Sequence, residues 1–449
     1  MCYHGCRLLA ICPSRRSAVG DVLKDNVYFV VRFVALAALV MSSAMASVEA
    51  PSAYKIIHSF GQHGSHGVDG ESPYSGLTID AAGNLYGTTS FNSGAYGGNG
   101  VAFELSPMAD GRWREAIIHI FQGTDGRTPY SSLTFDAAGN LYGTTTQGGA
   151  YSCGTVFELS ANNRQESVLY SFAGGSDGCT PGDSVVFDSK GNLYGTTVGG
   201  GLVNCINQTL GCGLVFELTP NSGGWTKKVL HEFTGGKDGG MARAGVVLDG
   251  NGNVYGTAAF GGMIKKCGTT GCGTIYELTP NSSGRWKFEV LHRFTDGDDG
   301  AAPFGTLTLD AENNIYGTTA SGGKYVYPGV VFELTRSSTG WKEQVLHAFT
   351  GGNDGASPYY ETLTFDKAGN IYGTTEAGGV YGNGVVFELM PSPEGTWREK
   401  VLHTFGSTSG DGANPYAGVI LDSAGRVFGT TLSGGHATIA AGTVFEKTP

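Results

Sequence analysis

The sequence predicts an all-β protein, a seven-bladed β-propeller with four antiparallel strands in each blade. A Tyr-Gly-Thr core recurs seven times, 52 to 61 residues apart, and a period of that length is typical of solenoids, propellers or arrays. Short segments rich in β-forming residues flank each core, and the chain begins with the segment that its last repeat lacks. The cores start at Tyr86, Tyr142, Tyr194, Tyr255, Tyr316, Tyr372 and, with Phe in place of Tyr, at Phe428.

Each repeat contains four strand candidates, here called A to D in chain order. In the sixth repeat they span residues 362–366, 370–375, 385–389 and 397–405. They are rich in Val, Ile, Thr, Tyr and Phe and are bounded by Gly, Asn, Asp and Pro, which is the pattern of strands joined by turns. The link between A and B has the length of a hairpin turn and contains a glycine that can adopt positive φ. Four antiparallel strands per repeat form a propeller blade.

The two ends of the repeat region predict a closed ring. Residues 54–60 match strand D, whereas the last repeat has strands at 418–422, 427–431 and 443–447 and then stops. The N-terminal strand is therefore expected to complete blade seven and to remove an exposed sheet edge. A solenoid would instead need atypical polar caps at both ends.

Residues 1–46 lie outside the repeat and have the pattern of a secretory signal peptide. An apolar run at 34–41 follows Arg32 and precedes an Ala-Met-Ala cleavage signal at 44–46. The run is too short for a comfortable membrane span, although an uncleaved anchor is an alternative and the long stretch before it leaves the start codon open. Residues 47–449 are predicted to form the single propeller.

The charge balance limits the class of partner. Of the 28 basic and 39 acidic residues, five basic and two acidic lie within residues 1–46, which leaves 23 against 37 and a net charge of −14. An acidic surface argues against nucleic acid and against anionic membranes. We expect a monomeric protein that is secreted or periplasmic and does not contact a membrane after signal cleavage.

Six cysteines, an even number, remain after residue 46. Two pairs each lie within one B–C loop, and the third joins a B–C loop to a D–A loop, connections that leave the same face of an up-and-down blade. Metal ligation is the alternative, but the spacings are not those of zinc sites. Disulfides, which need an oxidising compartment, are therefore predicted for Cys153–Cys179, Cys205–Cys212 and Cys267–Cys272.

The repeat resembles a known family. Residues 372–375 (Tyr-Gly-Thr-Thr), a glycine loop and residues 384–389 (Gly-Val-Val-Phe-Glu-Leu) are similar to the Gloeo-Verruco (GloVer) tandem repeat of exported bacterial proteins, and the resemblance covers residues 54–449. It implies a surface or secreted repeat protein, often with a C-terminal sorting anchor, and no established activity. Since the sequence ends at Pro449 without a hydrophobic tail, a freely soluble or periplasmic product is expected.

Polar residues that recur in every blade are interpreted as scaffold, because a reaction needs one site and not seven. In the first blade these are Asp80, Glu104 and His119, and Asp125 follows in the D–A loop. The strand-A aspartates are expected to accept backbone hydrogen bonds in the A–B turns. Only residues 296–300 (Asp-Gly-Asp-Asp-Gly) are acidic enough to suggest calcium, which stays an alternative. No metal, cofactor or catalytic residue is predicted, since no nucleophile elbow, zinc-protease motif or phosphate loop appears.

One position in each blade is a candidate for ligand binding. The fifth residue after each D–A-loop aspartate enters strand A, the innermost strand, and is expected to ring one mouth of the central channel. Aromatic side chains there stack on sugars or hold peptides, or they merely wedge neighbouring blades apart; the sequence favours neither. The ring breaks at Gly182 and Arg243 in blades three and four. The predicted ligand-binding residues are Arg243, Phe304, Tyr130, Tyr359, Tyr74 and Tyr416.

The favoured function is non-enzymatic binding of an extracellular glycan or protein through the face that carries the D–A and B–C loops, because variable loops on a constant scaffold commonly carry binding. The site is placed over blades three and four with Arg243 as its charged anchor. The alternatives are a lyase or lactonase-like enzyme acting in the channel mouth and a purely structural envelope protein; fold alone does not select between them. An enzyme would need Asp183, Glu361, His436 and Arg243 to converge.

Overall fold

The computed structural model describes residues 53–61, 69–92, 98–202, 205, 211–264, 266–325, 328–436 and 441–448. The chain divides into two units, Met1–Ser52 and Ala53–Pro449. The predicted signal peptide at 1–46 therefore lies outside the described residues. Within the described part, no helix is long and apolar enough to cross a membrane.

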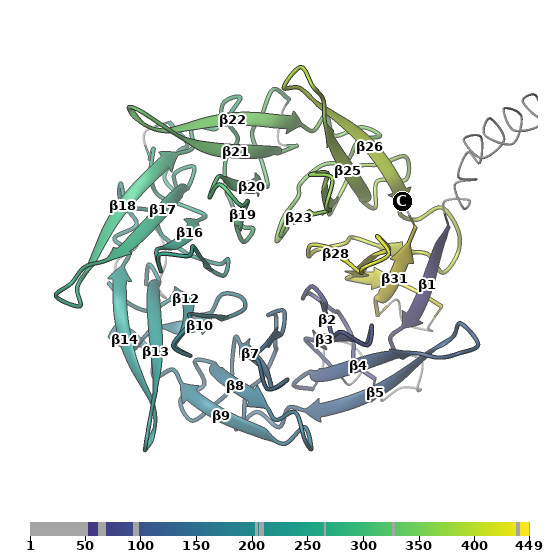
Figure 1. The fold of residues 1–449 in the computed structure, drawn as a ribbon, viewed down its shortest axis with the longest axis horizontal. Coiled ribbons are helices and arrows are strands. Elements are labelled where there is room, and N and C mark those ends of the chain that lie inside the picture. Colours follow the sequence, from purple (N-terminus) through teal and green to yellow (C-terminus); the bar gives the residue numbers. More distant parts are fainter. Residues whose placement is uncertain are drawn as a thin grey trace, which may run out of the picture. The chain divides into compact units, whose positions relative to one another are not determined.

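The described residues between 53 and 448 form seven antiparallel sheets, each with a short inner strand and a long outer one, arranged in a ring (Figure 1). Blade one consists of β2 (Thr78–Ile79), β3 (Leu85–Thr89), β4 (Val101–Pro107) and β5 (Trp113–Ile120). Blade two consists of β6 (Thr134–Phe135), β7 (Leu141–Thr145), β8 (Thr155–Leu159) and β9 (Glu166–Ser171). Blade three consists of β11 (Val186–Phe187), β12 (Leu193–Gly199), β13 (Leu214–Asn221) and β14 (Gly224–Glu232), and β10 (Cys179–Pro181) also pairs with β12.

The later blades repeat this order. Blade four consists of β15 (Val247–Leu248), β16 (Val254–Ala258), β17 (Thr274–Pro280) and β18 (Trp286–Arg293). Blade five consists of β19 (Thr308–Leu309), β20 (Ile315–Thr319), β21 (Val330–Ser337) and β22 (Gly340–Ala348). Blade six consists of β23 (Thr364–Phe365), β24 (Ile371–Thr375), β25 (Val385–Pro391) and β26 (Trp397–Thr404). Two further elements lie in loops: a 3-10 turn η2 (Gly175–Asp177), and a small sheet of β27 (Gly412–Ala413) and β30 (Ser433–Gly434).

Blade seven is assembled from both ends of the chain, as predicted. Its strands are β28 (Ile420–Leu421), β29 (Val427–Thr431), β31 (Thr443–Lys447) and, from the N-terminal side, β1 (Tyr54–Ser59). β1 runs antiparallel to β31, with Tyr54 opposite Lys447 and Ser59 opposite Thr443. The seven-bladed fold and its closure by the N-terminal strand are thus confirmed.

The first threonine of each Tyr-Gly-Thr core joins its blade to the next one. Its hydroxyl donates to a main-chain carbonyl in the segment that leads into the neighbouring inner strand, as from Thr144 to Asp183 at 3.0 Å and from Thr196 to Ala244 at 2.7 Å. The inner strands are paired over only two residues, shorter than the five predicted from the sequence.

The recurrent aspartate and tyrosine fix the A–B turn, as expected of scaffold residues. Asp80 Oδ1 accepts from the backbone amides of Ala82 and Asn84 at 2.9 Å, and its Oδ2 accepts from the Tyr86 hydroxyl at 3.1 Å. The same bonds recur in blades two to six around Asp136, Asp188, Asp249, Asp310 and Asp366. These hydrogen bonds account for the aspartates without a ligand.

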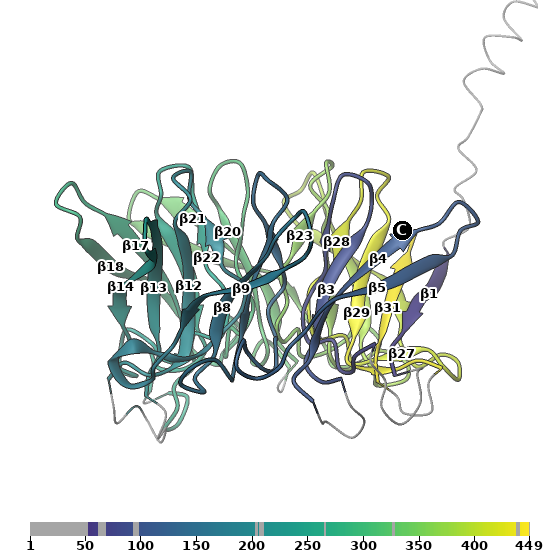
Figure 2. The same ribbon diagram turned by 90° about the horizontal axis from the view of Figure 1, so that it is seen from below.

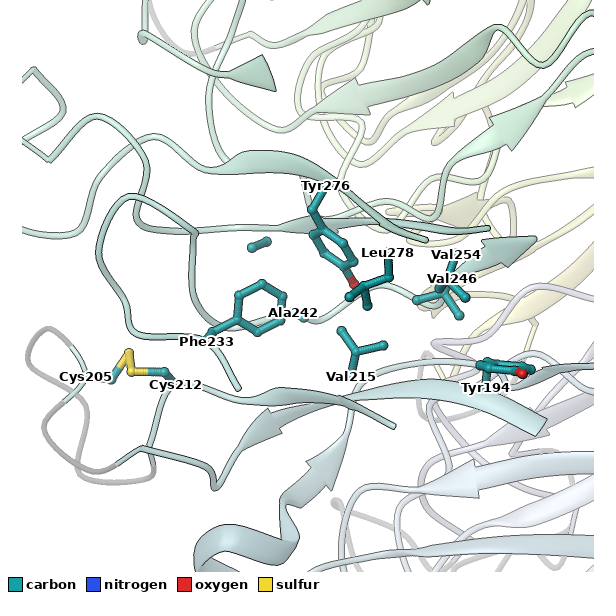
Figure 3. Close-up of a cluster of buried hydrophobic side chains, with 11 residues drawn as sticks. Tyr194, Cys205, Cys212, Val215, Phe233, Ala242, Val246, Val254, Tyr276 and Leu278 are labelled. Atoms are coloured by element: carbon teal, nitrogen blue, oxygen red, sulfur yellow. A yellow bond between two sulfur atoms is a disulfide. The ribbon is translucent and has the colours of Figure 1, made fainter. Parts of the chain in front are cut away.

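The hydrophobic core lies between adjacent blades and inside each sheet. Between blades three and four, Val215, Phe233 and Val254 are fully buried against Tyr276 (Figure 3). At this position the strand-C aromatic is Phe in the six other blades, and each of those rings is fully buried too. Because every blade packs mainly on its neighbours, the ring accommodates about 400 residues without one oversized core.

All three cysteine pairs are joined as predicted. Cys153–Cys179, Cys205–Cys212 and Cys267–Cys272 have Cα–Cα distances of 4.6, 5.0 and 5.3 Å. The first disulfide links the B–C loop of blade two to the connection into blade three, so it crosses between blades. The other two close the loops of blades three and four.

Candidate functional site

The D–A and B–C loops lie together on one face of the ring, the lower face in Figure 2, where β27 marks a D–A connection. Backbone hydrogen bonds interleave the two loop classes, for example from Arg127 N to Gln147 O at 2.7 Å. Each D–A loop also bonds to the B–C loop of the preceding blade, as from Met241 N to Cys212 O at 2.8 Å. The predicted clustering of these loops on one face is therefore confirmed.

Seven equivalent loop residues hold the chain as it turns into the channel. All are non-glycine residues with φ between 54° and 58°, the left-handed region that L-residues rarely adopt. They are Ser72, Thr128, Thr180, Met241, Ala302, Ser357 and Asn414. Each stands two residues before the predicted ring residue, which is the fifth after the loop aspartate. This repeated conformation costs free energy and directs the following side chains toward the channel mouth.

A cavity of about 560 Å³ occupies the channel at this face. Its lining includes four ring residues predicted to bind ligand, Tyr74, Tyr130, Arg243 and Tyr416. Hydroxyl-bearing side chains form much of the remaining wall: Ser75, Ser132, Ser184, Thr306, Thr362 and Thr364. The cavity therefore combines hydroxyl groups and aromatic rings with apolar side chains such as Leu77, Val419 and Ile420, and it suits a ligand with both polar and apolar faces.

The aromatic side chains form a continuous arc around the mouth. Ring centroids are 4.5 Å apart for Tyr74–Tyr130, 5.1 Å for Tyr74–Tyr416 and 5.2 Å for Tyr359–Tyr416. Phe304 and Tyr359 stack at 4.5 Å with 14° between their planes. Burial and the neighbouring Tyr74 hydroxyl raise the pKa of Tyr130 to about 12, so this phenol is protonated at neutral pH.

Not every predicted ring residue lines the cavity. Phe304 is only 6% exposed and packs between Phe260 and the tyrosines of blade six, which is the wedge role. Tyr359 stacks on Phe304 outside the cavity lining. The structure therefore brings Tyr74, Tyr130, Arg243 and Tyr416 together around the cavity and leaves Phe304 and Tyr359 behind them.

Tyr360, which the sequence reasoning missed, takes the place expected for Tyr359. The ring residue stands four positions before the first residue of the inner strand, as Tyr74 stands before Thr78, and in blade six that residue is Tyr360 before Thr364. Blade six has one extra residue between its loop aspartate and its inner strand. The doubled tyrosine, which occurs in this repeat alone, marks the insertion. Counting backward from the inner strand, and not forward from the loop aspartate, places Tyr360 at the ring position.

Arg243 ends the aromatic arc and contacts two of its members. Its Nη1 donates a 2.8 Å hydrogen bond to the Tyr360 hydroxyl across the mouth. Its guanidinium lies 5.8 Å from the centre of the Phe304 ring, within the range of a cation–π contact. Its Nε is buried and has no partner among the described residues.

The arc is open at blade three. A Cβ atom on Gly182 would lie 2.5 Å from the carbonyl oxygen of Arg243, so no side chain fits at this place. The next residue, Asp183, faces the cavity and accepts a 3.0 Å hydrogen bond from the Thr306 hydroxyl of blade five. Burial raises the pKa of Asp183 although hydrogen bonds from backbone amides and Thr306 oppose the shift.

The four polar residues that an enzyme would need do not all converge. Asp183 and Arg243 line the cavity, whereas Glu361 is 1% exposed and lies inside blade six, where Thr374 donates to it at 2.7 Å. Burial raises the pKa of Glu361 to about 8. His436 lies in a different hollow at the outer edge of blade seven, together with Tyr54 and Gly410.

Potential metal ligands gather away from the mouth. Among the described residues, two groups place one ligand atom each within 4.8 Å of one another, His58–Asp69–Glu115 and His119–Asp125–Glu166. Both lie between the outer strands of adjacent blades. In the acidic loop considered for calcium, Asp299 accepts hydrogen bonds from the Thr295 amide at 3.0 Å and contacts His292 at 3.2 Å.

Comparison with known proteins identifies the repeat and adds no activity. The model of the Gloeobacter/Verrucomicrobia repeat matches residues 44–266 and 258–449. No curated protein matches the sequence. Among solved structures, a putative 6-phosphogluconolactonase from Bacteroides uniformis is 13% identical with a TM-score of 0.46, covering 78% of this chain and 96% of that one. PorZ, a surface component of the type-IX secretion system of Porphyromonas gingivalis, is 12% identical with a TM-score of 0.49, covering 84% of this chain and 46% of that one.

Proposed function

This chain belongs to the Gloeobacter/Verrucomicrobia repeat family, and we propose that it is an exported, non-enzymatic binding module that holds a glycan in the channel mouth. The observation that carries the proposal is the cavity itself, in which Tyr74, Tyr130 and Tyr416 supply aromatic faces above a wall of hydroxyl groups. Aromatic faces stack on sugar rings, and a few convergent polar groups fix orientation.

Export is part of the proposal and has separate support. Three disulfides join all six cysteines that follow residue 46, and such bonds persist in oxidising compartments. The apolar segment at 34–41 supplies a signal-peptide pattern. We infer a secreted or periplasmic protein, with a glycan favoured over an extracellular protein because the site is a cavity and not a flat face.

Catalysis is the second candidate, and the separation of the polar residues weighs against it. A lyase or lactonase-like reaction needs an acid, a base and an electrophile within reach of one substrate. Here Glu361 is enclosed in blade six, and His436 lines a different hollow. A purely structural role would leave the cavity unused.

A glycan array probed with the purified protein tests the proposal. Glycan binding that is lost in Tyr74→Ala and Tyr416→Ala supports it, provided that both variants melt like the parent. Tyr151→Ala is the matched control, because Tyr151 is 62% exposed on a B–C loop of the same face and does not line the cavity. Binding that is unchanged in Tyr74→Ala and Tyr416→Ala but lost in Tyr151→Ala would place the site on the exposed loops instead of in the cavity.

A further inference from the structure

We propose that the ligand of the channel mouth is an acidic sugar and that Arg243 binds its carboxylate. The inference rests on the proposed function and specifies the chemical class of its ligand.

Arg243 is an oriented donor with capacity left. It is the sole cation among the described residues that line the cavity. The bond from Nη1 to Tyr360 and the contact with Phe304 hold the guanidinium in place, and its Nη2 donates to no side chain of the described residues. A carboxylate can accept from two guanidinium N–H groups at once.

The charge of Arg243 is not neutralised inside the cavity. Asp183 is the only carboxylate in the described lining, and the ion pairs of the described residues do not include one between Asp183 and Arg243. Asp183 instead accepts from Thr306 and from backbone amides. A ligand with one negative charge would balance the single guanidinium, whereas a phosphate dianion would leave one negative charge unbalanced in a poorly solvated site.

The gap in the aromatic arc lies beside Arg243. Since Gly182 has no side chain, the arc of rings stops between Tyr130 and Arg243. A pyranose could stack on Tyr74 or Tyr130 with its carboxylate toward the guanidinium and its hydroxyl groups toward Ser184 and Thr306. A sugar is favoured over a peptide C-terminus because its several hydroxyl groups can bond to the hydroxyl-bearing side chains of the wall.

The test compares galacturonic acid oligosaccharides with their methyl esters, which keep the sugar and remove the charge. Binding is measured by titration calorimetry with the purified protein. The acid is expected to bind at least about tenfold more tightly than the ester, the effect of a charged hydrogen-bonded pair. Arg243→Gln should abolish this preference, so that the variant binds the acid and the ester with equal affinity. Arg127→Gln is the control, because Arg127 is exposed on the same face outside the cavity.

Each outcome decides between the proposals. Equal binding of acid and ester, or a preference that survives in Arg243→Gln, overturns the acidic-sugar inference and leaves glycan binding intact. If no sugar binds but peptides with a free C-terminal carboxylate bind and lose affinity in Arg243→Gln, the ligand is a peptide and the inference of a sugar is wrong. If no sugar, neutral or acidic, binds at millimolar concentration, both the inference and the proposed function fail.

Discussion

The hydroxyl of Thr430 donates a 2.9 Å hydrogen bond to the main-chain carbonyl of Ser75, 355 residues earlier in the sequence. This bond joins blade seven to blade one and completes the set of threonine contacts between neighbouring blades. It forms only if the ring closes, and β1 closes the ring by pairing with β31.

Deletion of residues 54–60 should lower the melting temperature sharply and reduce solubility. The deletion removes β1, exposes the edge of β31 and leaves the Phe60 pocket empty, although Phe60 is fully buried. Thermal unfolding followed by circular dichroism measures the effect. A truncated protein that melts with the parent would show that the ring does not need its N-terminal strand.

Tyr276→Phe should stabilise the protein by about 1–2 kcal/mol. The Tyr276 hydroxyl is fully buried and has no hydrogen-bond partner in the described part of the chain, and a buried unsatisfied group costs about this much. The other six blades carry Phe at this position. Chemical denaturation provides the measurement, with Tyr255→Phe as the opposite control. That hydroxyl donates to Glu277 at 3.0 Å, so its loss should destabilise.

Removing each disulfide should lower the free energy of unfolding by a different amount. Cys153–Cys179 closes the longest loop, with a sequence separation of 26, and the chain-entropy model gives it about 3.5 kcal/mol against about 2 kcal/mol for each short loop. Replacing both cysteines of one pair by Ser, one pair at a time, and measuring unfolding free energies checks the order. Non-reducing peptide mapping first establishes the pairing; free thiols or crossed pairs would contradict the structure.

Glu115→Gln should reduce the pH dependence of stability. Glu115 faces His58 and Asp69 between blades, and burial together with the Asp69 charge raises its pKa from an ordinary 4.5 to about 8. Between pH 4.5 and about 8 this carboxyl binds more protons in the folded state than in the unfolded state. It therefore stabilises the folded state at low pH, and this contribution is lost as the pH rises toward 8.

Unfolding free energies of Glu115→Gln and the parent, measured from pH 4.5 to 8, provide the check. The parent should lose more stability than the variant across this range. Glu289→Gln is the control, because Glu289 is exposed on an outer strand and should show the parent's profile. If Glu115→Gln loses as much stability with rising pH as the parent, Glu115 does not contribute to the pH dependence.

Much of the candidate site followed from the repeat. Equivalent positions in seven repeats occupy equivalent places in seven blades, so the count from each loop aspartate located Tyr74, Tyr130, Arg243 and Tyr416. The same count failed in blade six, where one inserted residue shifts the inner strand and puts Tyr360 at the mouth. Such an insertion shifts the inner strand relative to the loop aspartate and leaves the residue types of the repeat the same. Only the pairing with the neighbouring strand shows on which side of the ring residue the extra residue lies.

The number of blades, their strand order, the closure by residues 54–60 and the cysteine pairs could be predicted, because they follow from local periodicity and chain connectivity. Which ring residues face the cavity depends on packing between blades, and the repeat pattern does not contain it. Whether an aromatic side chain lines the mouth, as Tyr130 does, or packs behind it, as Phe304 does, depends on the space left by neighbouring blades. The contact of Arg243 with Tyr360 likewise joins blades that are not adjacent, and no spacing in the sequence encodes that distance.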